Sequence, residues 1–182
     1  MFDAKLYWDQ RYADGKTSGS GSYGEPADKK INDILKLVGD NKIDSILDIG
    51  CGDFNVGNII NKALKPKTYI GLDISDEVLK MNKSKYPDVK FEEIDYSKTG
   101  KYDLVLCLDV LYHAIDDYDK LCDFIKRQDS KYFAIQQLID DKKAPDYIVK
   151  KEFNYKEFLQ GYTVEKKVSK GENTYLYLYK KI

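Results

Sequence analysis

The chain has 182 residues, with 30 Lys and Arg against 31 Asp and Glu and a formal net charge of −1. This length suits one domain with a substantial core, and the charge balance lacks the basic excess that drives binding to nucleic acid. No stretch approaches the ~18 apolar residues of a membrane span, and the first residues lack the apolar core of a signal peptide. We therefore expect a cytoplasmic protein that acts on small molecules, without nucleic-acid or membrane partners.

Cysteine and histidine usage argues against a metal site. The three cysteines lie in or beside apolar runs, which predicts buried, reduced thiols rather than bridges or ligands. His113 is the only histidine, so no metal is expected.

The first 25 residues differ in composition from the rest. Residues Leu6 to Ala13 carry aromatic side chains at helical spacing, which predicts a short amphipathic helix. A Gly/Ser run over 15–24 follows, and we expect it to lack regular structure. Such a run is typical of a linker or frayed terminus, but beside an aromatic helix it also suits a lid that closes on a ligand. We expect residues 1–25 to form this helix and lid, and residues 26–182 to form the core of a single domain.

From Pro26 onward, expected helices alternate with expected strands. This alternation is typical of a parallel sheet covered by helices on both faces, with the ligand at the carboxyl ends of the strands. After the fifth strand and one more helix, the last two strands are joined by a turn that suits only an antiparallel hairpin. The expected helices are 26–40, 56–64, 75–85, 116–127 and 147–160, and the expected strands are 45–49, 69–73, 89–94, 102–108, 132–138, 162–168 and 174–179.

The last expected strand carries three tyrosines on one face and two leucines on the other, because side chains alternate along a strand. We expect Tyr175, Tyr177 and Tyr179 to pack in or beside the core. The alternative is a platform on which bases stack, but no surplus of basic residues accompanies it.

The first expected strand ends in a glycine turn. Ile46-Leu-Asp-Ile-Gly-Cys-Gly52 describes a buried strand that breaks where the backbone must approach a ligand. Asp73 ends the second strand about twenty residues later, where an acid can accept hydrogen bonds from the ribose of a nucleoside. The two motifs together predict a site for a nucleoside cofactor.

These features together resemble the class I S-adenosylmethionine-dependent methyltransferases. The resemblance is carried by the five parallel strands, the final hairpin, the glycine turn, and the acids that end strands two and three. It implies a doubly wound, Rossmann-like α/β sheet of seven strands, mostly parallel, whose last strand runs antiparallel between the fifth and sixth. The implied cofactor is S-adenosyl-L-methionine, and the implied product is S-adenosyl-L-homocysteine.

The resemblance also implies a role for each matching position. Asp48 would hold the glycine loop, and Phe54 stands where the family usually has a small residue, so we expect the backbone from Phe54 to Gly57 to lie farther from the cofactor. The implied contacts are Gly50, Cys51 and Gly52 with the methionine part, Asp73 with the ribose, Ile74 with the adenine face, Asp95 with the adenine amino group beside Tyr96, and Leu108 and Asp109 with the methyl-donor end.

The N-terminal sequence is similar to a narrower group, small bacterial methyltransferases associated with cell-surface polysaccharide gene clusters. The similarity rests on Trp8-x-x-Arg11-Tyr12, on the Gly/Ser run, and on Asp109-Val-Leu-Tyr-His113. It implies that Trp8, Arg11 and Tyr12 close over the cofactor, with Arg11 pairing its carboxylate or, alternatively, being only a surface charge. The expected acceptor is a small molecule or glycan-type compound, methylated at oxygen.

His113 is a candidate general base for such an acceptor. It follows the fourth strand on the ligand edge, and an imidazole suits proton abstraction at neutral pH. The alternative is that His113 only packs on a helix or bonds the loop, while Asp109 orients the ring or serves as the base itself.

Two other functions remain open from the sequence. A nicotinamide-dependent dehydrogenase would also use a glycine turn and an acid near Asp73, but it would normally have a third glycine where Asn55 stands and would rarely have an acid at the position of Asp48. A non-catalytic S-adenosylmethionine-binding protein or scaffold would keep the nucleoside-binding acids.

Overall fold

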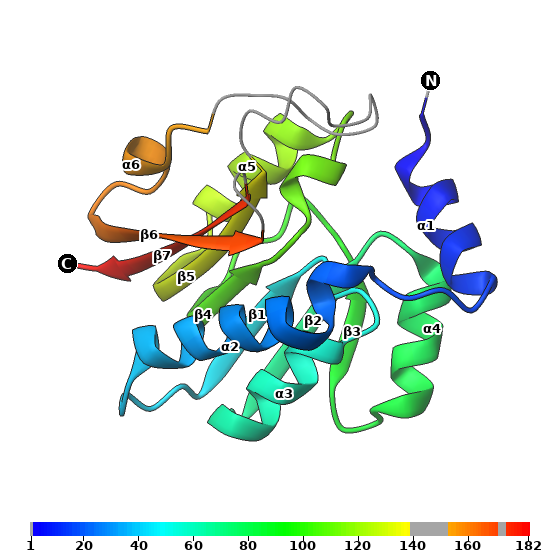
Figure 1. Cartoon of the computed structure of the whole chain (residues 1–182), viewed down its shortest axis with the longest axis horizontal. Coiled ribbons are helices and arrows are strands. Elements are labelled where there is room, and N and C mark those ends of the chain that lie inside the picture. The colour runs from blue at the N-terminus through cyan, green and yellow to red at the C-terminus, as the bar shows by residue number, and fades with distance from the viewer. Residues whose placement is uncertain (1, 139–152, 171–173) are drawn as a thin grey trace.

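The computed structural model of the chain describes residues 2–138, 153–170 and 174–182. These residues form a seven-stranded sheet in the order β3-β2-β1-β4-β5-β7-β6 (Figure 1). Strands β1 to β5 run parallel to one another, and β7 runs antiparallel between β5 and β6. The predicted fold class is therefore confirmed, including the final hairpin. The strands are β1 (Ser45–Ile49), β2 (Thr68–Asp73), β3 (Lys90–Glu93), β4 (Lys101–Cys107), β5 (Asp129–Leu138), β6 (Tyr162–Lys170) and β7 (Thr174–Lys181).

The helices agree with the sequence pattern except in three places, one of which is the short 3₁₀ helix η2 after β4, which was not expected. The Gly/Ser run, expected to lack regular structure, contains the short 3₁₀ helix η1. The last expected helix, 147–160, lies partly outside the described residues, and within them helix covers only α6. No helix in the described ranges is long and apolar enough to span a membrane. The helices are α1 (Ala4–Ala13), η1 (Ser20–Ser22), α2 (Gly24–Val38), α3 (Asn55–Leu64), α4 (Asp76–Lys85), η2 (Leu111–His113), α5 (Tyr118–Lys126) and α6 (Tyr155–Phe158).

Two apolar clusters cover the two faces of the sheet. On one face, α2 and α3 pack their apolar stripes against the strands, and α5 packs on the other face. The final strand contributes to both clusters: Tyr177 and Tyr179 lie under α5 and α6, while Leu176 and Leu178 lie on the α2 side. All four side chains are almost fully buried, and burying a side chain of this size stabilises the fold by about 1.5–3 kcal/mol. The prediction that these tyrosines pack in the core is confirmed.

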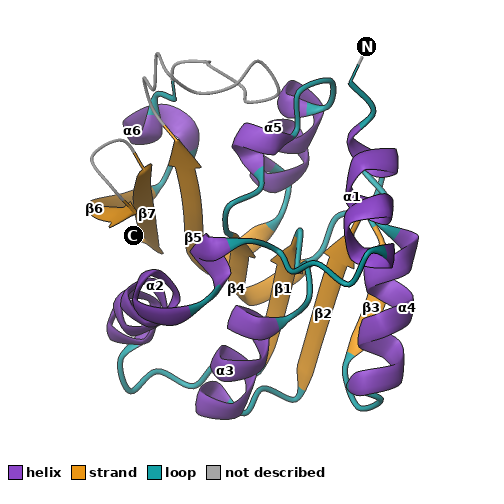
Figure 2. Ribbon diagram, turned by 45° about the vertical axis from the view of Figure 1, so that its right-hand side comes forward, coloured by secondary structure: helices purple, strands orange, loops and turns teal. Residues whose placement is uncertain are grey.

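Helix α1 packs beside α4 rather than on the sheet (Figure 2). Polar contacts hold it there: Lys5 forms an ion pair with Asp76 at 3.0 Å, and the Ser75 hydroxyl donates to Asp9 at 2.7 Å. Ser75 also caps α4, because its Oγ accepts from the N–H of Val78 at 3.3 Å. The aromatic N-terminal helix therefore stands beside the carboxyl ends of β2 and β3.

Candidate functional site

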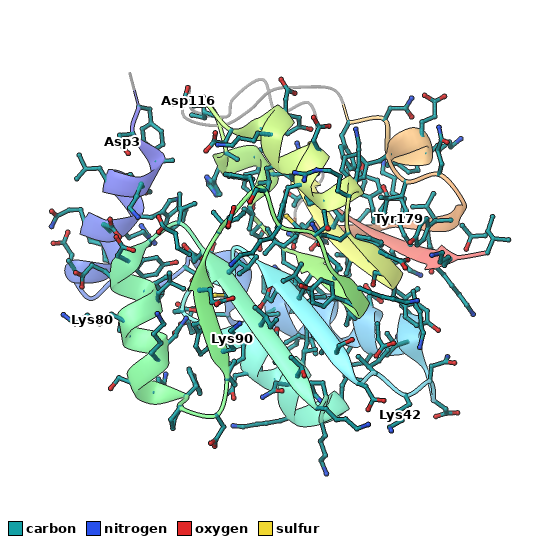
Figure 3. The ribbon with its side chains drawn as sticks, turned by 180° about the vertical axis from the view of Figure 1, so that it is seen from behind. Asp3, Lys42, Lys80, Lys90, Asp116 and Tyr179 are labelled. Carbon is teal, nitrogen blue, oxygen red and sulfur yellow. The ribbon has the colours of Figure 1, made fainter. Side chains whose placement is uncertain are left out.

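A cavity of about 700 Å³ lies at the carboxyl edge of the sheet, within the volume range of cofactor sites. Its wall combines the turn after β1, the ends of β2 and β4, helix α1 and the start of α5. Strands β1 and β4 are neighbours in the sheet, but the chain passes outward through β2 and β3 before it returns to β4. Doubly wound sheets bind ligands at the point where the strand order reverses in this way. Asp3 and Asp116 belong to this wall, and both lie at the upper end of the molecule in Figure 3.

The glycine turn is the floor of the cavity. Gly50 and Gly52 have φ values of 71° and 51°, in the left-handed region that favours glycine. A Cβ on Gly50 would come within 2.3 Å of the Val110 side chain, and one on Gly52 would come within 2.3 Å of Ser18 Oγ. Both glycines are therefore required by close packing, the first against the segment after β4 and the second against the N-terminal segment.

Asn82 is a contributor to this turn that the sequence analysis did not identify. Its amide Nδ2, on the buried side of α4, donates to the carbonyl of Gly52 at 2.7 Å. The available signal was an asparagine at helical spacing from Val78 and Leu79 on an otherwise apolar stripe.

Asp73 joins the glycine turn to the start of α4. Its Oδ2 accepts from the N–H of Gly52 at 2.9 Å, and its Oδ1 accepts from the N–H of Ser75 at 3.0 Å. Burial raises the pKa of this carboxyl, and the backbone donors oppose that rise because they bind the charged form. Asp73 lines the cavity and is held in place before any ligand binds.

Asp48 and Cys51 also line the cavity. The hydroxyl of Tyr69 donates to Asp48 at 2.8 Å. Burial raises the pKa of Asp48 to about 7, although the Tyr69 hydrogen bond lowers it. Burial likewise raises the pKa of the Cys51 thiol, which therefore remains protonated at neutral pH.

Phe54 does not keep the start of α3 away from the cavity, contrary to expectation. Its backbone is left-handed, with φ of 62°, and its ring turns into the core, 5.1 Å from the ring of Tyr69 and 5.0 Å from that of Phe91. Because the side chain points away from the site, Asn55 and Gly57 line the cavity. The bulky residue is accommodated by the core rather than by the ligand site.

The N-terminal segment is fastened to the glycine turn. The N–H of Ser18 donates to Asp53 at 2.8 Å, and the N–H of Asp53 donates to the Ser18 hydroxyl at 2.8 Å. The Tyr23 hydroxyl donates to the same carboxylate at 2.7 Å, and Asn55 donates to the carbonyl of Ser22 at 2.6 Å. These four hydrogen bonds hold residues 18–23 over the turn. Asp53 was not among the predicted site residues.

Trp8 and Tyr12 line the cavity from α1, whereas Arg11 does not. The rings of Trp8 and Tyr12 stack at 5.8 Å, and the Tyr12 hydroxyl lies 3.0 Å from Ser18 Oγ. Arg11 donates from Nε to the carbonyl of Thr17 at 2.7 Å. Its pairing with a cofactor carboxylate stays a prediction.

His113 lies on the cavity wall against α1. Its ring meets Trp8 edge-on, with centroids 5.4 Å apart and an interplanar angle of 84°. The ring centroid of Tyr112 lies 4.5 Å away. The structure thus brings His113 together with the aromatic N-terminal helix, across more than a hundred residues of sequence.

Asp109 is held by two partners that the sequence analysis did not identify. Lys30 donates to its Oδ2, and the Tyr112 hydroxyl donates to its Oδ1. Burial raises the pKa of Tyr112, and the Asp109 charge raises it further, so the phenol stays protonated as a donor. Lys30 shares the buried face of α2 with Ala27 and Ile34. A lysine at that spacing within an apolar stripe was the available signal.

Of the predicted site residues that follow β2, β3 and β4, all except Asp95 line the cavity. Ile74, Tyr96 and Leu108 line it, and Lys120 Nζ lies 4.2 Å from the Tyr96 ring centroid. Asp95 is exposed and does not line this cavity, because its carboxylate accepts from the N–H and hydroxyl of Ser97 at 3.0 and 2.7 Å. Those hydrogen bonds lower the pKa of Asp95.

Comparisons with known proteins point to one family. Residues 47–128 match the family described as "Methyltransferase domain". The ubiquinone biosynthesis O-methyltransferase of Bordetella avium is 30% identical over 94 residues, covering 46% of this chain and 37% of that protein. The corresponding protein of Nitrosomonas europaea is 26% identical over 98 residues, covering 48% of this chain and 40% of that protein. The chain thus spans well under half the length of these curated relatives.

The fold is shared with solved methyltransferase structures. The N-methyltransferase NodS of Bradyrhizobium japonicum, in complex with S-adenosyl-L-homocysteine, aligns over 99% of each chain with a TM-score of 0.80 and 13% sequence identity. Its similarity extends to the whole chain, whereas the family match covers β1 to the end of α5. Residues 47–128 therefore resemble a methyltransferase domain, and the described residues share the seven-stranded fold of solved methyltransferases.

Proposed function

We propose that the protein is an S-adenosylmethionine-dependent methyltransferase that methylates a small-molecule or glycan-type acceptor at oxygen. The observation that carries the proposal is the Asp73 carboxylate at the end of β2, fixed beside the glycine turn in the wall of a cofactor-sized cavity. The family match over residues 47–128 supports methyl transfer. The two relatives named O-methyltransferases support an oxygen acceptor, and the glycan-type acceptor rests on the N-terminal sequence similarity.

The residues present fit the proposed cofactor. Gly50 and Gly52 give close backbone access for its methionine part, and Asp73 accepts from the ribose hydroxyls, each charge-assisted bond contributing about 1.5–3 kcal/mol. Ile74 and Tyr96 line the cavity, and Ile74 would lie against the adenine with Tyr96 beside it. When bound, S-adenosylmethionine supplies an activated methyl group on its sulfonium. Asp95 and Arg11 do not line the cavity, so both side chains would have to move to contact the adenine amino group and the cofactor carboxylate.

The acceptor end lies near His113. A hydroxyl acceptor must lose a proton as the methyl group arrives, and His113 is suited to receive it. Asp109 lies in the same wall, where Lys30 and the Tyr112 hydroxyl donate to its two carboxylate oxygens, and we assign it a positioning role beside His113. Displacement at a methyl group relies mainly on alignment of donor and acceptor, so few further groups are needed.

The chain forms a single domain, in which residues 1–25 are the lid and residues 26–182 are the core. The contacts of Ser18 and Asp53 hold the lid over the glycine turn, while Trp8 and Tyr12 close the side of the cavity. Closure excludes water from the transfer site and orders the acceptor pocket.

The proposal is tested first by binding and then by turnover. Isothermal titration calorimetry with S-adenosylmethionine, S-adenosylhomocysteine and NAD should show binding of the first two only. Incubation with S-adenosylmethionine and a panel of sugars, phenols and amines, followed by mass spectrometry, should yield S-adenosylhomocysteine with a hydroxyl acceptor. Binding of S-adenosylmethionine without turnover of any acceptor in the panel would favour a non-catalytic binding protein or scaffold. Binding of NAD alone would favour a dehydrogenase.

A further inference from the structure

The pair of Lys30 and Asp109 is a buried ion pair in the wall of the cavity. Only 1% of the Lys30 side chain and 14% of the Asp109 side chain are exposed. Burying an ammonium group costs several kcal/mol unless a partner compensates it, and Asp109 is the partner that the structure gives Lys30. A buried ion pair often stabilises a fold no more than well-packed apolar residues of similar volume would, so a charge on this apolar stripe calls for a functional explanation.

Three separate elements surround the Asp109 carboxylate, and two of them donate hydrogen bonds to it. Lys30 approaches from α2 and Tyr112 from η2, while a Cβ on Gly21 of the lid would lie 2.6 Å from Asp109 Oδ2. Asp109 itself is left-handed, with φ of 60°, which is costly for a residue other than glycine. The surrounding structure therefore fixes this carboxylate, and both Lys30 and Asp109 line the cavity.

The charge of the pair matters because the two forms of the proposed cofactor differ in charge. S-adenosylmethionine carries a sulfonium cation, and S-adenosylhomocysteine carries a neutral thioether at the same place. A lone carboxylate in the wall would bind the donor more tightly than the product. Tighter binding of the donor in its ground state does not accelerate methyl transfer. A cation next to the carboxylate reduces the extra affinity for the donor and so avoids this unproductive binding.

We propose that Lys30 is a positioning residue that offsets the Asp109 charge and thereby sets the preference of the site for the cationic donor over its neutral product. Lys30 acts through Asp109 and not on the reacting atoms. The inference rests on the proposed function, because it requires that the cavity binds these two ligands with their sulfur atom near Asp109.

The experiment measures dissociation constants of both ligands by calorimetry and compares their ratio between variants. Lys30→Met should raise the preference for S-adenosylmethionine over S-adenosylhomocysteine by about tenfold. This factor corresponds to about 1.4 kcal/mol, which an unpaired carboxylate in partly buried surroundings can supply to a nearby cation. Asp109→Asn should lower the preference by a similar factor. Lys30→Arg and the double variant Lys30→Met/Asp109→Asn should both return the ratio close to that of the wild type.

The matched control is Lys29→Met, which removes the same charge from an exposed position on the same helix and should leave the ratio unchanged. A general loss of packing would weaken both ligands equally, so an unchanged ratio in Lys30→Met and Asp109→Asn overturns the inference. If Lys30→Met does not fold, Asp109→Asn and the double variant decide by the same ratio. A wild-type protein that binds neither ligand overturns the proposed function itself, whereas binding with invariant ratios overturns the role of Lys30 alone.

Discussion

Ser18 and Asp53 hold each other through two reciprocal hydrogen bonds, each 2.8 Å long. The backbone N–H of each residue donates to the side chain of the other, in the manner of a capping box. Because one residue belongs to the N-terminal segment and the other to the glycine turn, the pair ties the proposed lid to the proposed cofactor floor. Opening the lid requires that both bonds break.

Removing the serine hydroxyl should loosen the lid. Ser18→Ala deletes the acceptor for Asp53 N–H and the contact with Tyr12, at a cost of about 0.5–1.5 kcal/mol per hydrogen bond. Amide hydrogen exchange over residues 15–24 should therefore be several-fold faster in the variant, and S-adenosylhomocysteine should slow it in the wild type. Lys16→Gln, at an exposed position in the same segment, is the control. If the exchange rate changes neither in the variant nor with the ligand, residues 15–24 are a linker and not a lid.

Asp73 should be required for cofactor affinity. Asp73→Ala removes the proposed ribose acceptor and the carboxylate that binds the N–H groups of Gly52 and Ser75. Binding of S-adenosylmethionine should weaken by about 1.5–3 kcal/mol or more. Calorimetry on Asp73→Ala and on Asp88→Asn, an exposed aspartate before β3, checks this. Unchanged affinity in Asp73→Ala would remove the central support for the proposed function.

His113 can be tested once an acceptor has been identified. His113→Gln and His113→Ala should reduce the rate of transfer by on the order of 10²–10⁴, with cofactor affinity intact, if the imidazole accepts the proton. The ring also packs on Trp8 at 5.4 Å, so a structural role would show as loss of cofactor binding and of thermal stability in the same variants. Normal turnover in both variants would mean that transfer depends on positioning alone.

Asp48 should make stability depend on pH. Burial raises the pKa of its carboxyl from 3.8 to about 7 in the folded protein. Its contribution to the free energy of unfolding is fully present below about pH 4 and is lost as the pH rises through 7, because folding then disfavours the charged form. Asp48→Asn does not titrate and keeps an acceptor for the Tyr69 hydroxyl. Relative to wild type, the variant should therefore gain stability with rising pH, by up to about 4 kcal/mol at about 1.4 kcal/mol per pKa unit.

Urea unfolding of the ligand-free protein at pH 4.5 and pH 7.5 measures this difference, with Asp88→Asn as an exposed control. Titrating groups that do not interact with Asp48 cancel between the wild type and the variant, so a stability difference that is the same at both pH values would show that folding does not raise the pKa of Asp48.

The succession of strands and helices follows from local sequence, whereas the place of the last strand between the fifth and sixth came from the family resemblance. Hydrophobic runs of strand length alternate with helical stripes, and the chain geometry of parallel strands then leaves few arrangements. The glycine turn and Asp73 could be placed for the same reason, since each stands directly at the end of an apolar run and the carboxyl ends of parallel strands share one edge. Helix ends shifted by one or two residues, as expected where caps rather than periodicity decide.

The tertiary structure decided which side chains meet across that edge. The sequence contains no local pattern that links Lys30 to Asp109, 79 residues apart, or Ser18 to Asp53, 35 residues apart. Those contacts depend on how α2 and the N-terminal segment pack on the sheet. Asp95 shows the converse: its position at the end of β3 was correctly expected, but the nearby Ser97 donors turn its carboxylate away from the cavity. Periodicity determines where the backbone goes, whereas the direction of a polar side chain depends on the hydrogen-bond partners that folding brings near it.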